Sequence, residues 1–320
     1  MPHSLIPPFA YFGGKRRASG YIWPRFGQPT TYIEPFFGSG CVLLGNPNGA
    51  PEREIVNDID GLLTNFWRAL KADPECTAYH ADYPTSHLDL IARNHSLLDA
   101  ADGLTARLRQ DPDYCDFRLA GWWVWSVSNS IPMAVSPANT RPFVLNHPGG
   151  QGIQAARRDL GPNPLPLSGQ RLREWFQVLS DRLWRTTILC CDWSRVVTGE
   201  LICQHLLPRH PCAIFFDPPY ATQGRHNTLY RMESTTIAQD VQQWALEHQD
   251  TPGLLICVAG YAADYGDWPD AWERVVWSTH QGRMGGPKDE QGYARTECLW
   301  FSPQCLKSHS DAPQMGRLLH

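Results

Sequence analysis

Short apolar runs that end on a turn or acidic residue recur along the chain and restrict its fold more than any other feature. They are TTYIEP at 30–35, REIVND at 53–58, TTILCCD at 186–192, CAIFFD at 212–217, GLLICVAG at 253–260 and WERVVWS at 272–278. Such runs are typical of strands buried on both faces of a mostly parallel sheet. Helical patterns separate several of them, for example at 60–73 and 235–249. The alternation predicts a doubly wound α/β sheet.

The alternation stops in the middle of the chain. An apolar, aromatic helical segment at 115–130 precedes a stretch at 131–168 that is rich in Pro, Gly and Asn, and so long a loop is uncommon inside a compact domain. We therefore expect one domain formed by residues 1–72 and 184–303, a separate insert at 73–183 that closes with a helix at 169–183, and a flexible tail at 304–320. Trp122, Trp123 and Trp125 are expected to pack inside the insert, because Leu119, Val124 and Val127 accompany them.

Composition excludes several classes of protein. The 320 residues are 42% hydrophobic, which is enough for a large core, and no run of about 18 apolar residues could span a membrane. The first residues lack the apolar core of a signal peptide, so a cytoplasmic protein is expected. The 10 cysteines form no C-x-x-C pair and no zinc-type spacing, which predicts reduced thiols and no metal site. The net charge of −4 does not decide whether DNA binds.

Two strand ends carry features of a nucleoside site, since ligands of open parallel sheets bind beyond the carboxyl ends of the strands. Gly38 and Gly40 flank Ser39 after the first run, so a ligand can approach the backbone there. Asp58 ends the second run, where an acid typically accepts hydrogen bonds from ribose; a helix N-cap is the alternative. Leu43 replaces the third glycine of a dinucleotide fingerprint, and a P-loop ending is absent. S-adenosylmethionine, which has a ribose but no phosphate, fits this turn best.

The fourth run ends in a rigid corner, Asp217-Pro218-Pro219-Tyr220. Proline fixes its own φ, lacks an N–H and restricts the residue before it, so the Asp217 carboxylate and the Pro218 carbonyl are left as adjacent acceptors. Two acceptors suit an amino group with two N–H bonds, and the Tyr220 ring suits a stacked base. The amine lone pair could then attack the sulfonium methyl, provided the base is flipped out of the duplex. The alternative is a plain turn that ends a strand.

These features resemble, in order as well as content, the Dam-type family of S-adenosylmethionine-dependent DNA N6-adenine methyltransferases, particularly its phage-borne members. The matching segments are PFAYFGGKR at 8–16, EPFFGSG at 34–40, NDID at 57–60, CCDW at 190–193 and DPPY at 217–220. The resemblance implies a Rossmann-like, mostly parallel sheet of the class I methyltransferase fold. It also implies that the segment at 73–183 is an inserted, mainly helical and loop-rich target-recognition domain.

The resemblance implies specific roles for residues of this chain. The implied cofactor-binding residues are Tyr11, Gly14, Lys15, Glu34, Pro35, Phe36, Gly38, Gly40, Asp58, Asp192, Trp193 and Asp217. The implied catalytic residues are Asp217, Pro218, Pro219 and Tyr220, with no metal ion. Two alternatives stay open: Lys15 as an ordinary solvated lysine, and Asp192 with Trp193 as a helix cap and a core aromatic. Cys41 and Asp60 depart mildly from the family pattern.

Double-stranded DNA is the implied partner. The arginines expected near it are Arg141, Arg157, Arg158, Arg171, Arg173, Arg225 and Arg231. Residues 221–231 are expected to form a loop over the target base, and residues 281–300 a hairpin. The resemblance also allows a cognate restriction enzyme as a partner, a monomer or a weak dimer as the acting form, and a bacterial or phage-infected cell as the setting.

Three other functions compete with N6-adenine methylation. N4-cytosine methylation uses the same amine chemistry, but its enzymes more often carry Ser in place of the corner acid, so Asp217 favours adenine. A non-catalytic DNA-binding module of the same fold would be expected to have damaged motifs, whereas these are intact. A nicotinamide-dependent dehydrogenase would be expected to have a glycine where this chain has Leu43. That function would also give no role to the Pro218-Pro219 corner.

Overall fold

The structure is a computed structural model, and it describes residues 5–9, 15–84, 86–129, 168–198, 211–219, 236–279 and 296–307. Within these residues no helix is long and apolar enough to cross a membrane.

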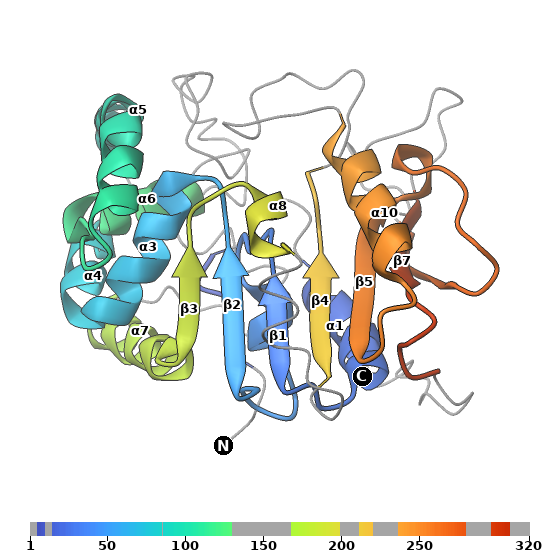
Figure 1. Cartoon of the computed structure of the whole chain (residues 1–320). Coiled ribbons are helices and arrows are strands. Elements are labelled where there is room, and N and C mark those ends of the chain that lie inside the picture. The colour runs from blue at the N-terminus through green and yellow to red at the C-terminus, as the bar shows by residue number, and fades with distance from the viewer. Residues whose placement is uncertain are drawn as a thin grey trace.

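A mixed, mostly parallel sheet forms the centre of the molecule (Figure 1). Its seven described strands lie in the order β3-β2-β1-β4-β5-β7-β6. Neighbouring strands from β3 to β5 run parallel, whereas β7 runs antiparallel to both β5 and β6. The bounds are β1 Thr31–Glu34, β2 Arg53–Asn57, β3 Thr186–Leu189, β4 Cys212–Phe216, β5 Leu254–Tyr261, β6 Glu273–Thr279 and β7 Thr296–Phe301. The predicted α/β class and doubly wound sheet are confirmed.

Helices cover both faces of the sheet, because successive strand residues point to opposite sides. Phe215 of β4 joins the core shared with α1 (Arg16–Phe26), α2 (Cys41–Leu44) and α3 (Gly61–Ala72). Phe216, the next residue, joins the second core, shared with α8 (Trp193–Val196) and α10 (Ile237–His248). Every residue of β4 and β5 is buried, which explains their uninterrupted apolar runs.

The helical part of the predicted insert packs directly against α3. It consists of α4 (Pro74–Ala81), α5 (His87–Gln110), α6 (Phe117–Asn129) and α7 (Gln170–Leu183). The Phe66 ring of α3 lies 5.6 Å from Trp123 of α6 and 6.0 Å from Phe176 of α7. Asn65 exchanges two hydrogen bonds of 2.8 Å with the backbone of Asp116. These helices therefore extend the main core, and Trp123 and Trp125 are buried as expected. The loop-rich residues 130–167 lie outside the described residues, and target recognition by this segment stays a prediction.

The end of the described chain is attached to the domain. Cys305 is buried, and the backbone N–H of Leu306 donates to the carbonyl of Arg25 at 2.8 Å. Residues 304–307, expected to begin a flexible tail, are thus packed against α1 and β5; residues 308–320 lie outside the described part.

Candidate active site

The candidate site lies where the strand order reverses. The chain passes from β1 to β2 and β3 on one side, and β4 lies on the other side of β1. Open α/β sheets bind ligands in the crevice at the carboxyl ends of two such strands. Glu34 ends β1 there, and Asp217 directly follows β4 (Figure 1).

Lys15 reaches this crevice from the turn before α1. Its Nζ lies 2.9 Å from Oδ1 of Asp217 and 3.7 Å from Oε1 of Glu297 in β7. The Trp277 ring of β6 lies 5.7 Å from the same Nζ, within range of a cation–π interaction. Only 2% of the lysine side chain is exposed, so the alternative of a solvated lysine is wrong.

Burial acts on two carboxyl groups at this end of the sheet, Asp217 and Glu34. Burial raises the pKa of Asp217; Lys15 lowers it and the charge of Glu297 raises it further. Burial holds the pKa of Glu34 well above its ordinary value, with Asp217 adding to the rise, while the hydroxyl of Tyr32 donates to Glu34 at 2.9 Å. The carboxyl groups of Asp217, Glu297 and Glu34 outnumber the single cation of Lys15 at this end of the sheet.

The glycine turn after β1 presents backbone without side-chain bulk. Gly38 and Gly40 have φ values of 48° and 67°, a left-handed region that favours glycine. A Cβ on Gly40 would lie 2.8 Å from a ring carbon of Phe37. The indole N–H of Trp67 donates to the Gly38 carbonyl at 3.0 Å, which ties the turn to α3. The turn of residues Gly38 to Gly40, called the cradle below, is thus held in a fixed position.

Asp58, which follows β2, holds this turn from the other side. Its Oδ2 accepts the N–H of Gly38 and its Oδ1 accepts the N–H of Asp60, both at 3.0 Å. Burial raises the pKa of Asp58 to about 7, against the lowering effect of these N–H bonds. Asp60, not Asp58, caps α3, because its side chain accepts the N–H of Leu62. The N-cap alternative therefore applies to Asp60.

The end of β3 completes the described crevice. Asp192 is exposed and caps α8 by accepting the N–H of Ser194 at 2.9 Å, as its structural alternative predicts. The Trp193 ring lies 6.1 Å from Phe36 and 6.0 Å from Phe216. Trp193 is thus partly buried beside Phe36, and its ring forms an apolar surface next to the end of β3.

Residues 11–99 match the family model for D12 class N6 adenine-specific DNA methyltransferases. Over this stretch the chain is similar to that family. None of the curated proteins compared with it is a significant match. The matched stretch contains Lys15, the glycine turn and Asp58, whereas the Asp217 corner lies beyond it. The match indicates a DNA adenine-N6 methyltransferase, and it implies S-adenosylmethionine as the methyl donor and DNA as the substrate.

The structure gathers most of the predicted site residues of this methyltransferase. Pro218 is buried and Pro219 partly buried beside Asp217, and Pro35 and Phe36 follow Glu34 in the same crevice. Three predicted residues lie outside the described part: Tyr11, Gly14 and Tyr220. The same holds for five of the predicted DNA contacts, Arg141, Arg157, Arg158, Arg225 and Arg231. Arg171 and Arg173 lie on α7, which Figure 1 shows away from the arrowheads of β1 and β4.

Two polar residues of the methyltransferase crevice were missing from the predicted site. Glu297 directly precedes the apolar run of β7, and that position was its signal in the sequence. Asn57 links three strand ends: its amide N–H groups donate to the carbonyls of Pro35 and Cys191, and its Oδ1 accepts the N–H of Cys191. Its position in the NDID segment was visible, but its partners become neighbours only in the folded sheet.

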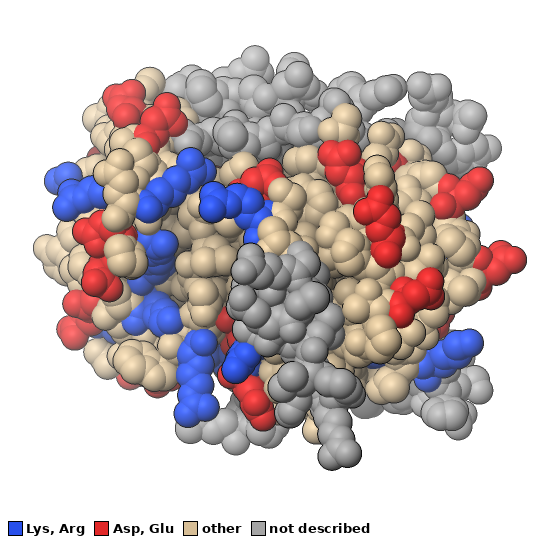
Figure 2. Space-filling model, in the orientation of Figure 1, with Lys and Arg blue, Asp and Glu red and all other residues tan. Residues whose placement is uncertain are grey.

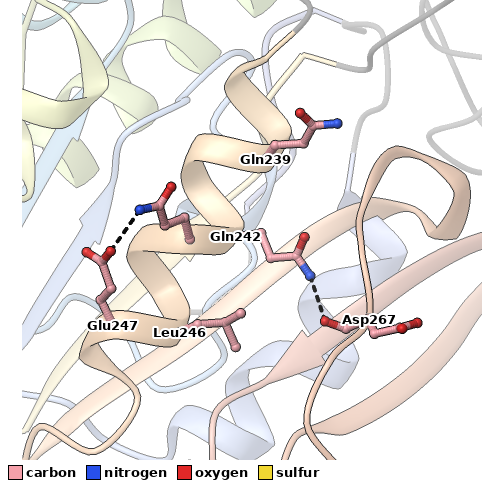
Figure 3. A pocket seen from close by; sticks show the side chains of 6 residues that line it. Gln239, Gln242, Leu246, Glu247 and Asp267 are labelled. Carbon is pink, nitrogen blue, oxygen red and sulfur yellow. Dashed lines mark hydrogen bonds between the residues drawn. The ribbon is translucent and has the colours of Figure 1, made fainter.

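The surface divides by charge in the view of Figure 2. Lys and Arg side chains form a band on the side of the helical layer, whereas acidic side chains predominate on the α10 side. A hollow on that second side, of about 430 Å³, is lined by Gln239, Gln242, Gln243, Leu246, Glu247 and Asp267 (Figure 3). None of these is a predicted site residue; Gln242 clamps the loop after β5 through Gly266 and Asp267. In the described ranges no three His, Cys, Asp or Glu side chains gather to hold a metal ion.

Proposed function

We propose that the protein transfers a methyl group from S-adenosylmethionine to the N6 amine of an adenine flipped out of double-stranded DNA, with Asp217 and Pro218 accepting the hydrogen bonds of that amine. The observation that carries the proposal is the buried contact of 2.9 Å between Lys15 and Asp217 at the reversal of strand order. The contact occupies Oδ1 of Asp217 and fixes the carboxylate at the corner, so that Oδ2 is available to an incoming amine.

The described residues fit the proposed methyl donor. The glycine turn lies beside the end of β1, and Gly38, with a φ of 48°, adds no side chain there. The carboxyl groups of Asp217 and Glu297 at this end of the sheet suit a donor that carries a sulfonium and an ammonium group. Asp58 offers carboxylate lone pairs beside the turn for ribose hydroxyls. When bound, S-adenosylmethionine supplies an electrophilic methyl group on a positively charged sulfur.

The corner can raise the nucleophilicity of the amine. An adenine amine that donates one N–H to Asp217 and the other to the Pro218 carbonyl is drawn toward tetrahedral geometry, which frees its lone pair from the ring. A new N–C bond forms as the S–C bond breaks, the sulfur keeps the electron pair, and the amine then loses a proton. Preorganised acceptors of this kind need no rearrangement during the reaction.

DNA is proposed to approach from the carboxyl edge and from the side of the helical layer. The band of Lys and Arg in Figure 2 lies on that side, and such a band attracts a phosphate backbone. Base readout is assigned to the segment between α6 and α7. The arginines predicted there stay candidates for phosphate and base contacts.

Mass spectrometry of nucleosides tests the proposal. A DNA duplex incubated with the protein and S-adenosylmethionine is expected to yield N6-methyl-2′-deoxyadenosine, and Asp217→Ala is expected to abolish transfer while cofactor binding persists. Asp270→Ala, a change at an exposed loop acid, is the matched control and should keep full activity. A fully active Asp217→Ala protein would refute the corner mechanism, and N4-methylcytosine as the sole product would refute the target base.

A further inference from the structure

Glu297 is a buried acid next to the apolar part of a strand. The four residues that follow it in β7, Cys298 to Phe301, are all buried, and 3% of Glu297 itself is exposed. β7 lies between β5 and β6, where Glu297 is opposite Tyr261 on one side and Ser278 on the other. A carboxylate in such a place is costly unless it is paired, so packing alone does not account for it.

Its carboxylate shares the lysine of the catalytic corner. Lys15 Nζ lies 3.7 Å from Oε1 of Glu297 and 2.9 Å from Oδ1 of Asp217, so one ammonium faces two carboxylates from different strands. An ammonium has three N–H donors that rotate freely about the last bond of the side chain. If the attraction of Glu297 were removed, these donors could shift toward both oxygens of Asp217 and compete with an incoming amine.

We infer that Glu297 is a positioning residue for methyl transfer: it holds Lys15 so that the ammonium bonds one oxygen of Asp217 and leaves the other to the adenine amine. The inference rests on the proposed function, because it assigns Oδ2 of Asp217 to the amine. Glu297 itself touches neither the base nor the methyl donor in this scheme. It acts through the lysine.

The charges around Asp217 predict the direction in which each variant should shift the pKa of Asp217. The groups that interact electrostatically with Asp217 come from several elements: Lys15, Glu297, Glu34, Cys41, Cys257 and Tyr265. Of these, Lys15 lowers the pKa of Asp217 and Glu297 raises it. Removing the charge of Glu297 should therefore ease ionisation of Asp217, whereas removing Lys15 should hinder it.

Single-turnover methylation of an adenine-containing duplex, measured across about pH 5 to 9, tests the inference. Glu297→Gln is expected to lower the plateau rate by ~10- to 100-fold, the loss that a misplacement of about 1 Å causes. The acidic limb of its rate profile should move to lower pH, because Asp217 then ionises more easily. Lys15→Met should move that limb to higher pH.

Two further variants separate positioning from stability. Glu297→Asp keeps the charge but shortens the side chain. Its plateau rate should therefore fall, while the acidic limb of its pH–rate profile should lie at the same pH as in the wild type. Glu273→Gln, the matched control, removes an acid from the neighbouring strand β6 that pairs with Arg25; both its limb and its plateau rate per folded molecule should be unchanged.

An unshifted acidic limb in Glu297→Gln, in a folded protein with an active wild type, would overturn the inference. So would an equal loss of rate in Glu297→Gln and Glu297→Asp without any shift, since that pattern indicates a structural role alone. If the Gln variant does not fold, a wild-type plateau rate in Glu297→Asp overturns it. A wild type that methylates no adenine would instead refute the proposed function.

Discussion

Replacing Lys15 by Met removes the cation of the catalytic corner while keeping a side chain of similar length. Only 2% of the wild-type Lys15 side chain is exposed and its ammonium contacts Asp217 at 2.9 Å, but 20% of the Asp217 side chain is exposed. Removing one partner of a buried ion pair costs about 3–5 kcal/mol, and the partial exposure of Asp217 places this case near the lower end, at about 3 kcal/mol. The loss arises because two carboxylates, Asp217 and Glu297, are left without the cation that they share.

The loss should grow with pH. Lys15 lowers the pKa of Asp217, so in Lys15→Met the folded-state pKa rises further above that of the unfolded chain. Below the pKa of Asp217 in the unfolded chain, the carboxyl group is protonated in both the folded and the unfolded state. Lys15→Met then has little effect on stability through the ionisation of Asp217. As pH rises toward the folded pKa, the unfolded chain ionises first and folding stability falls.

Urea unfolding at about pH 5.5 and about pH 8 measures this effect, with Asp217→Asn and the double variant completing a mutant cycle. The double variant should recover part of the loss, giving a coupling of about 1–3 kcal/mol at the higher pH. The reasoning is wrong if the coupling is below about 0.5 kcal/mol at both pH values. It is also wrong if the deficit of Lys15→Met shrinks as pH rises.

Three further predictions concern the cradle and its support. Because burial raises the pKa of Asp58 to about 7, affinity for S-adenosylmethionine should fall as pH drops below that value, and Asp58→Asn should bind weakly with a flat pH profile in calorimetric titrations. Gly40→Ala should lose about 1–3 kcal/mol of stability, because φ is 67° and a Cβ would lie 2.8 Å from a ring carbon; Gly103→Ala, at an open site on α5, should melt no lower than wild type. Arg182→Met breaks a bidentate pair with Glu54 and should cost about 3–5 kcal/mol by urea unfolding, without changing the rate per folded molecule.

The sequence predicted the parallel part of the sheet well, because a strand buried on both faces leaves an uninterrupted apolar run. The runs at 53–58 and 212–217 differ from β2 and β4 only in that their terminal acids, Asp58 and Asp217, lie just beyond the strands. These acids were recognised for the same reason: an acid after an apolar run has few structural explanations. Their partners were not evident, since hydrogen bonds to Gly38 or Lys15 depend on the crossing of the strands.

The sequence predicted less where packing between distant segments decides the structure. The long loop indicated an insert, but it could not show that Leu97, Leu104 and Leu108 of α5 join the core with α3. A hairpin was expected at 281–300, yet only strand pairing determines that β7 lies between β5 and β6. Glu297 was therefore overlooked, because its partner lies near the other end of the chain.

The position of β7 has a consequence for how the protein is made. Among the described strands, β6 pairs only with β7, which is synthesised after it, so that pairing forms only once Thr296–Phe301 has left the ribosome. The same six residues bring Glu297 to the corner. A nascent chain that has completed the described parallel strands is thus still an unfinished enzyme, and methylation capacity should appear only after β7 has been synthesised and has paired.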